Sequence, residues 1–132
     1  MTPSLLAVDD EPNILDFLER VFRQEYIVLR AQDAEEALAV LQEQPPEELP
    51  RVLVSDQRMP GQSGLELLAL VAETYPGVTR VLLSGFSDLP EISEASQSGL
   101  VHAYVVKPVS SRRLTEAVTE ARARHVRGDF TR

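Results

Sequence analysis

The sequence predicts an α/β protein built on a doubly wound, five-stranded parallel sheet. Five short apolar runs alternate with five helical patterns along the 132 residues, and such alternation is typical of a parallel sheet with helices on both faces. Most of the runs are apolar throughout, as expected for strands buried on both sides. The length matches about one domain. At this size we expect the smaller doubly wound type, with strand order 2-1-3-4-5.

The apolar runs that predict strands are short and aliphatic. Four of them are nearly continuous, at 5–8, 52–54, 81–83 and 104–106. The remaining run, Ile27-Val28-Leu29, is flanked by Tyr26 and Arg30. Because it is the least complete, we expect it to lie nearer an edge of the sheet.

The helices are predicted from apolar residues at helical spacing between these strands, at 14–22, 34–41, 65–71, 88–98 and 114–121, with Pro12 near the first turn of the first helix and Ser110-Ser111 leading into the last. Two of them begin with a capping pattern, in which a Ser or Asp precedes a Glu by three positions, at 33–36 and 63–66. The segment 88–98 is the weakest, because Ile92 and Ala95 are nearly its only apolar anchors. We expect that helix to be marginal and mobile.

Composition excludes several classes of function. There is no Cys, hence no disulfide framework, thiolate nucleophile or Cys-type zinc site. The net charge of −8 makes tight binding to nucleic acid improbable for this domain. No apolar run approaches the roughly 20 residues that span a bilayer, so we expect no membrane partner and a cytoplasmic location. His102 and His125 show no metal-ligand spacing and are expected to be ordinary.

Polar residues follow four of the predicted strands at the point where each strand ends. Asp9-Asp10-Glu11 follows the first strand and Ser55-Asp56 the third, while Ser84-Gly85 and Lys107-Pro108 end the fourth and fifth. The carboxyl ends of parallel strands meet at one edge of the sheet, where ligands bind in this type of fold. Singly, each residue is more often a turn former, a cap or a solvated charge. Together they predict a shared site.

The residue types at this edge favour phosphoryl chemistry. Carboxylates in one cleft raise one another's pKa unless a cation joins them, and oxygen ligands favour Mg²⁺. A Lys or a Ser hydroxyl can hold a phosphoryl oxygen, and an Asp can act as nucleophile to form an aspartyl phosphate.

Several short motifs occur in order along the chain. They are Val8-Asp9-Asp10-Glu11, Val54-Ser55-Asp56, Met59-Pro60-Gly61, Gly64, Leu83-Ser84-Gly85 and Tyr104-Val105-Val106-Lys107-Pro108. In this order and spacing, from about Ser4 to Arg124, they resemble the receiver domain of two-component response regulators. The resemblance implies a flavodoxin-like (βα)5 fold and a signalling switch controlled by phosphorylation.

The resemblance also implies the chemistry of the site. Asp56 is expected to accept a phosphoryl group from a phosphohistidine of a sensor kinase. Asp10 and Asp56 are expected to bind Mg²⁺ directly, with the backbone carbonyl of Arg58 as a further ligand and Asp9 near the metal, through water.

Further residues are expected to read out the phosphoryl group. The resemblance implies that Ser84 and Lys107 contact the phosphoryl group. It also implies that Ser84 moves toward this group and that Tyr104 swings inward, so that the surface of the fourth helix, fifth strand and fifth helix is remodelled. The Lys107–Pro108 bond is expected to be cis.

Other positions vary within the family. Gln57, Arg58 and Phe86 are expected to tune the lifetime of the phosphoryl group. Gln62 departs from the apolar residue that is frequent after Met59-Pro60, which we interpret as a change in loop packing.

Two other interpretations stay open. One is a receiver-like module that docks partners without phosphorylation. The other is a phosphohydrolase of the haloacid dehalogenase type, which needs an Asp two residues after its nucleophile; the chain has Arg58 there. On the leading interpretation the domain is not an enzyme beyond its own phosphorylation and slow dephosphorylation.

The resemblance also implies partners and limits. The partners are a sensor histidine kinase or phosphotransfer protein and a downstream output domain or target, and a phosphorylation-dependent dimer is compatible with it. Residues 1–125 are expected to form the receiver domain and 126–132 a tail or the start of a linker. We expect either a single-domain regulator or the N-terminal receiver of a longer protein, and lean to the latter.

Overall fold

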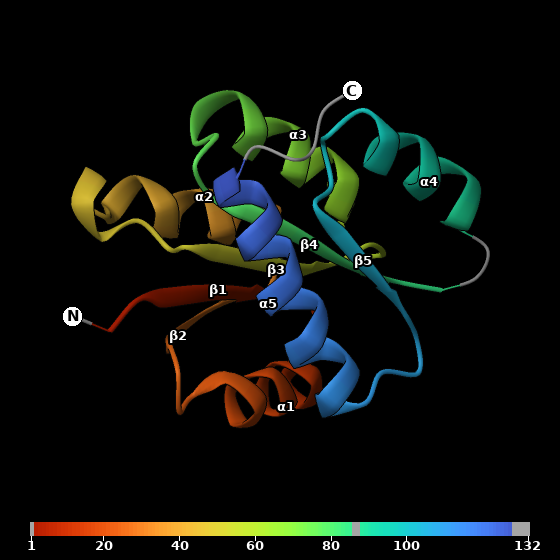
Figure 1. The fold of residues 1–132 in the computed structure, drawn as a ribbon. Coiled ribbons are helices and arrows are strands. Elements are labelled where there is room, and N and C mark those ends of the chain that lie inside the picture. The colour runs from red at the N-terminus through yellow and green to blue at the C-terminus, as the bar shows by residue number, and fades with distance from the viewer. Residues whose placement is uncertain (1, 86–87, 128–132) are drawn as a thin grey trace.

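The computed structural model describes residues 2–85 and 88–127, in which five strands alternate with five α-helices (Figure 1). The strands are β1 (Ser4–Val8), β2 (Ile27–Ala31), β3 (Val52–Asp56), β4 (Thr79–Ser84) and β5 (Ala103–Val106). The helices are α1 (Pro12–Phe22), α2 (Ala34–Glu43), α3 (Gly64–Thr74), α4 (Leu89–Gln97) and α5 (Ser111–Arg127). A short 3₁₀ turn, Pro46–Glu48, interrupts the loop before β3.

The strands form one parallel sheet in the order β2-β1-β3-β4-β5. The predicted strand order is therefore confirmed, as is the place of β2 at an edge, where Ile27 is exposed. The predicted strands were too short by one or two residues at several ends. Most of these terminal residues, such as Thr79 and Arg80 at the start of β4, are polar and give no apolar signal; Ala31 and Ala103 are the exceptions.

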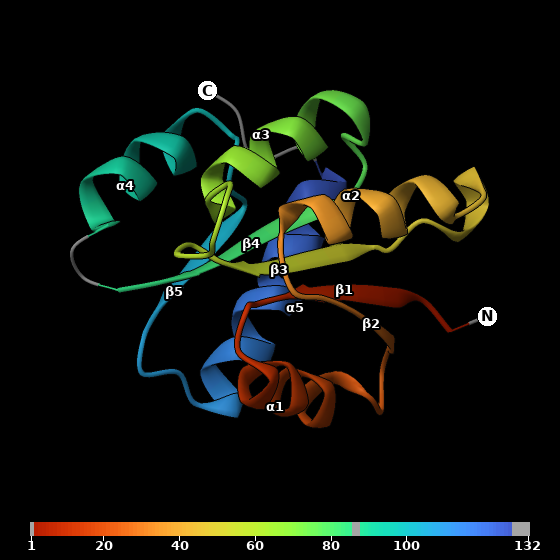
Figure 2. The same cartoon turned by 180° about the vertical axis from the view of Figure 1, so that it is seen from behind.

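Two helical layers cover the sheet, α1 and α5 on one face and α2, α3 and α4 on the other (Figures 1 and 2). Side chains alternate along each strand, so Leu5 and Ala7 pack under α1 and α5 while Leu6 and Val8 face α2 and α3. Burial on both faces explains why the strands read as continuous apolar runs.

The capping patterns predicted for α2 and α3 are both present. The Glu36 N–H donates to Asp33 Oδ1 at 2.8 Å, and Ser63 and Glu66 form a reciprocal capping box. Helix α4 is anchored through the fully buried Ile92, as its sparse pattern predicted. None of the helices in 2–85 and 88–127 has the length and apolar character needed to cross a membrane.

Candidate functional site

The carboxyl ends of β1, β3, β4 and β5 bring the predicted polar residues to one edge of the sheet. In the sheet register, Val8 lies beside Ser55, Asp56 beside Leu83, and Ser84 beside Val106. Asp9 and Lys107 each follow directly on their strand. Residues that are far apart in the sequence therefore meet at the place that the strand order predicted.

Three carboxylates meet at the centre of this edge. Oxygen atoms of Asp9, Asp10 and Asp56 lie within 4.8 Å of one another, with Asp9 and Asp56 buried and Asp10 exposed. One oxygen of Asp9, Oδ2, is buried and has no hydrogen-bond partner within the described part of the chain. An all-oxygen cluster with an unpartnered buried carboxylate oxygen fits a hard divalent cation.

The electrostatics of Asp9 indicate the same requirement. Burial, together with the charges of Asp56 and Asp10, raises the pKa of Asp9 to about 6, against the opposing effects of the Glu11 N–H and Lys107. A carboxyl group that resists ionisation in this way is unfavourable as an anion until a positive charge joins the cluster.

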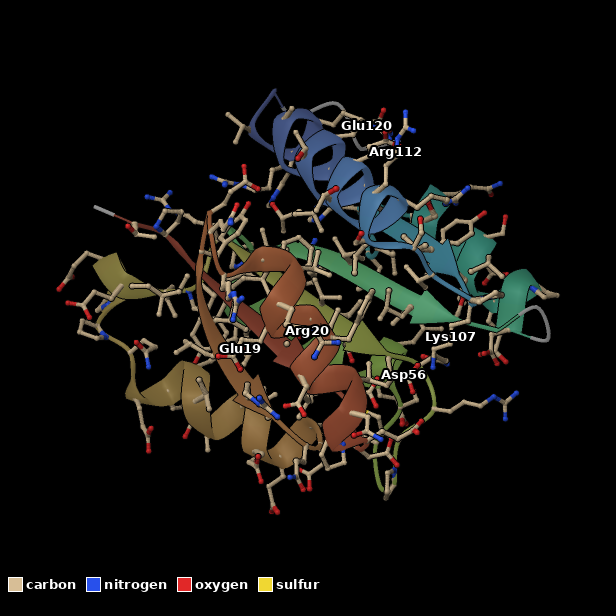
Figure 3. The ribbon with its side chains drawn as sticks, turned by 90° about the horizontal axis from the view of Figure 1, so that it is seen from below. Glu19, Arg20, Asp56, Lys107, Arg112 and Glu120 are labelled. Carbon is tan, nitrogen blue, oxygen red and sulfur yellow. The ribbon has the colours of Figure 1, made fainter. Side chains whose placement is uncertain are left out.

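Lys107 supplies one such charge, on the side of Asp56. Its Nζ lies 2.6 Å from Asp56 Oδ1, and the two side chains face each other at the end of the sheet (Figure 3). Burial lowers the pKa of Lys107, but the hydrogen bond and charge of Asp56, with Asp9 and Glu11, more than offset it and the pKa is raised. Lys107 therefore stays an ammonium group beside the proposed phosphoacceptor.

Ser84 and Tyr104 lie on the β4–β5 side of the site. The Ser84 Oγ is buried without a hydrogen-bond partner among the described residues, so it is available to a ligand oxygen. The Ser84 carbonyl accepts from the Lys107 N–H at 2.8 Å, which ties the two residues together. Tyr104 is 37% exposed, and the Lys107–Pro108 bond is cis, as predicted.

Gln57 has a structural role that the sequence analysis missed. Its backbone carbonyl accepts from the Gly64 N–H at 2.9 Å, and its side-chain Oε1 accepts from the Leu65 N–H at 2.8 Å. Ser63 accepts only from the Glu66 N–H, so the other N–H groups in the first turn of α3 need further acceptors. These unsatisfied N–H groups were the signal from which the role of Gln57 could have been predicted. The buried Gln57 thus fixes the loop that follows Asp56.

Replacing Gly64 by Ala is expected to disturb this loop and lower the free energy of unfolding by about 1–3 kcal/mol. A Cβ at Gly64 would press on the Asp56 carbonyl oxygen and lie 2.7 Å from Leu82 Cδ1. Chemical denaturation measures the loss. Gly77→Ala, where a Cβ meets no heavy atom within 4 Å, is the matched control and should change stability little.

The remaining predicted site residues have different outcomes. The Arg58 side chain forms an ion pair with Asp88, and the role of its backbone carbonyl as a metal ligand stays a prediction. Phe86 lies outside the described residues. The predicted effect of Gln57, Arg58 and Phe86 on the lifetime of a phosphoryl group also stays a prediction.

A parallel (βα)5 sheet with an acid cluster and a Lys at its carboxyl edge fits a phosphoacceptor signalling domain. The family model for the response regulator receiver domain matches residues 5–119. The chain belongs to this family. The resemblance stated from the motifs is thereby confirmed, and the haloacid dehalogenase interpretation is set aside.

Known relatives extend this result. The chain is 35% identical over 130 residues to the hydrogenase transcriptional regulatory protein HoxA of Cupriavidus necator, covering 98% of this chain but 26% of that protein. The chain thus spans about a quarter of that relative's length.

Solved structures show the same architecture. A CheY-like receiver domain protein from Methanospirillum hungatei superposes with a TM-score of 0.84 at 26% identity, covering 97% of this chain and 99% of that one. The response regulator TrrA of Thermotoga maritima, solved in complex with Mg²⁺-BeF, gives a TM-score of 0.76 at 28% identity, covering 90% and 98%.

Proposed function

We propose that this receiver domain is switched by phosphorylation of Asp56. The observation that supports the proposal best is the placement of the Lys107 ammonium 2.6 Å from the Asp56 carboxylate, inside an acid cluster at the carboxyl edge of the sheet. The donor is a phosphohistidine of a sensor kinase or phosphotransfer protein. An Asp56 oxygen attacks phosphorus, the bond from phosphorus to the donor nitrogen breaks, and the nitrogen retains the electron pair.

The chain's own residues have distinct parts in this reaction. Asp56 is the nucleophile, and Lys107 neutralises charge on the transferring group. Ser84, with its free buried hydroxyl, donates to a phosphoryl oxygen. Tyr104, on β5, is exposed, and we propose that it moves as Ser84 shifts, so that the α4–β5–α5 surface changes. These roles make the domain a regulatory phosphoacceptor that catalyses its own phosphorylation and slow dephosphorylation.

Mg²⁺ is the cofactor we propose. Asp10 and Asp56 would hold it directly, with the Arg58 carbonyl, while Asp9 acts nearby through water. When bound, the ion supplies positive charge at the transferring phosphoryl group. The ionised form of Asp9, disfavoured by burial and by its neighbours, is favoured by such a cation.

Mass spectrometry tests the proposal directly. Incubation with acetyl phosphate and Mg²⁺ should add one phosphoryl mass to the protein, because Asp56 is the one proposed nucleophile. Asp56→Asn should remove the addition entirely while keeping the fold, since the amide has the same shape. A wild-type mass that does not change would instead support the alternative of a docking module that works without phosphorylation.

The remaining proposals concern context. The partners are a kinase or phosphotransfer protein upstream and an output domain or target downstream, with a phosphorylation-dependent dimer as a further partner. Nucleic acid and membrane are not proposed as partners of this domain, and the cytoplasm is the proposed compartment. We propose 1–125 as the receiver domain and 126–132 as a tail or start of a linker; helix α5 crosses this boundary and ends at Arg127.

A further inference from the structure

The start of helix α4 differs from the starts of α2 and α3 in one respect. All three carry an Asp or Ser at the N-cap position and a Glu three residues later. In α2 and α3 the N-cap residue is extended and its side chain accepts from the N–H of that Glu. In α4 the N-cap residue Asp88 has φ −94° and ψ −3° and makes no capping hydrogen bond. Of these three helices, α4 alone has a capping sequence without the capping hydrogen bond.

Asp88 is paired with Arg58 in place of capping. The Arg58 Nη2 donates to Asp88 Oδ1 at 3.0 Å, across 30 residues of sequence. The other oxygen, Asp88 Oδ2, is buried with no hydrogen-bond partner in the described ranges. A buried carboxylate oxygen without a partner is unfavourable, so this arrangement depends on the contact with Arg58.

The amide that the cap would satisfy is well defined. Pro90, at the second position of α4, has no N–H to donate. Glu91 follows it and occupies the position whose N–H an N-cap carboxylate ordinarily accepts. The Glu91 amide therefore reports on whether Asp88 caps α4.

The pair lies beside the phosphoacceptor. Arg58 is two residues after Asp56, and Arg58, Asp88, Glu91 and Asp10 line one open hollow next to the site. The Arg58 side chain is 72% exposed and that of Asp88 only 10%, so solvent reaches the guanidinium but hardly reaches the carboxylate. A phosphoryl group on Asp56 would add a charge of about −1.5 to −2 and three acceptor oxygens two residues before Arg58 in the chain, and a guanidinium is suited to phosphate oxygens.

We propose that phosphorylation of Asp56 draws Arg58 from Asp88 to the phosphoryl group, and that the released Asp88 carboxylate then caps α4 by accepting from the Glu91 N–H. The inference rests on the proposed function, because the exchange needs the phosphoryl group. It assigns Arg58 and Asp88 as the positioning residues that transmit phosphorylation to the first turn of α4. Helix α4 is suited to this, since Ile92 is its main buried anchor.

Hydrogen exchange of the Glu91 amide, followed by NMR, tests the exchange of partners. Phosphorylation of the wild-type protein with acetyl phosphate and Mg²⁺ should slow exchange of this amide about fivefold, the effect of a typical N-cap. In the unphosphorylated protein, Arg58→Ala should slow it by a similar factor, because Asp88 is then free to cap. Arg112→Ala, which removes another exposed, ion-paired Arg, should leave it unchanged.

Substitutions at Asp88 complete the test. Asp88→Asn keeps a capping side chain but loses the charge that holds Arg58, so the Glu91 amide should be protected with or without phosphorylation. Asp88→Ala has no cap and should show no gain on phosphorylation. An Arg58→Ala protein with unchanged Glu91 exchange would overturn the competition between ion pair and cap.

The two proposals fail in distinguishable ways. If the added mass shows that Asp56 is phosphorylated while the Glu91 amide exchanges as before, the partner exchange is wrong and the phosphorylation switch stands. If no phosphoryl mass is added, the proposed function is wrong and the partner exchange falls with it.

Discussion

Acidification from pH 7 to pH 4 is expected to lower the free energy of unfolding by about 3 kcal/mol through His102 alone. Burial, with the charges of Arg80, His125 and Arg124, lowers the pKa of His102 from 6.5 to about 3. Because the folded protein binds this proton less readily than the unfolded chain, the stabilisation is complete above pH 6.5. It is lost as the pH falls from 6.5 toward 3.

The surroundings of His102 explain why it resists protonation. Its side chain is 4% exposed, and Nδ1 accepts from the Arg80 backbone N–H at 2.8 Å. The Arg80 guanidinium lies 3.3 Å from Nε2 on the other side, and the ring stacks on His125 at 3.9 Å between centroids. A proton on Nδ1 would remove that acceptor and place a second positive charge beside the guanidinium.

His102→Gln isolates this contribution. The Gln side chain offers an acceptor to the Arg80 N–H and does not titrate. Urea denaturation at pH 7 and pH 4 measures the decrease in the free energy of unfolding on acidification. This decrease should be about 3 kcal/mol smaller in the variant than in the wild type, whatever the variant's stability at pH 7. The carboxyl groups titrate in both proteins, so their contribution to the pH dependence cancels when the two are compared. Equal pH dependence in the two proteins would show that folding does not lower the pKa of His102.

The sequence could not reveal that the residues around His102 lie close together in space. Thr79, on β4, lies 46 residues before His125 of α5, yet their side chains are 2.8 Å apart. Arg80 is buried within β4 because its guanidinium donates to the carbonyls of Leu100 and Val78 at 2.8 and 3.1 Å. No periodicity marks such a residue, since it pairs with loop carbonyls that only the fold brings near. The expectation that the histidines are ordinary missed their contact with each other.

The acid cluster was predictable for a different reason. Strand order decides which strand ends meet, and the alternation of strands and helices at this chain length predicts the doubly wound order 2-1-3-4-5. Asp9, Asp56, Ser84 and Lys107 each stand directly at a strand end, so their convergence follows from topology without side-chain detail. Arg58 and Asp88 lie in loops, where topology sets no distance. Their ion pair could therefore be found only from the structure.

Mg²⁺ is expected to raise the free energy of unfolding by about 2.7 kcal/mol when its concentration is 100 times the dissociation constant. The physical reason is the carboxylate cluster, whose oxygens lie within 4.8 Å of one another with Lys107 beside Asp56 as the neighbouring ammonium. The folded protein brings these oxygens together and the unfolded chain does not, so the ion binds the folded state selectively. Thermal unfolding with and without MgCl₂, at matched ionic strength, measures the difference.

Asp10→Ala should remove most of this stabilisation while leaving the metal-free protein about as stable as the wild type. Asp10 is exposed, so its loss leaves no buried partner unsatisfied and relieves repulsion on Asp9 and Asp56. Glu73→Ala, an exposed acid on α3, should keep the full response to Mg²⁺. If Asp10→Ala responded to Mg²⁺ as strongly as the wild type, the ion would have to bind outside the cluster, and its proposed place beside the phosphoacceptor would be wrong.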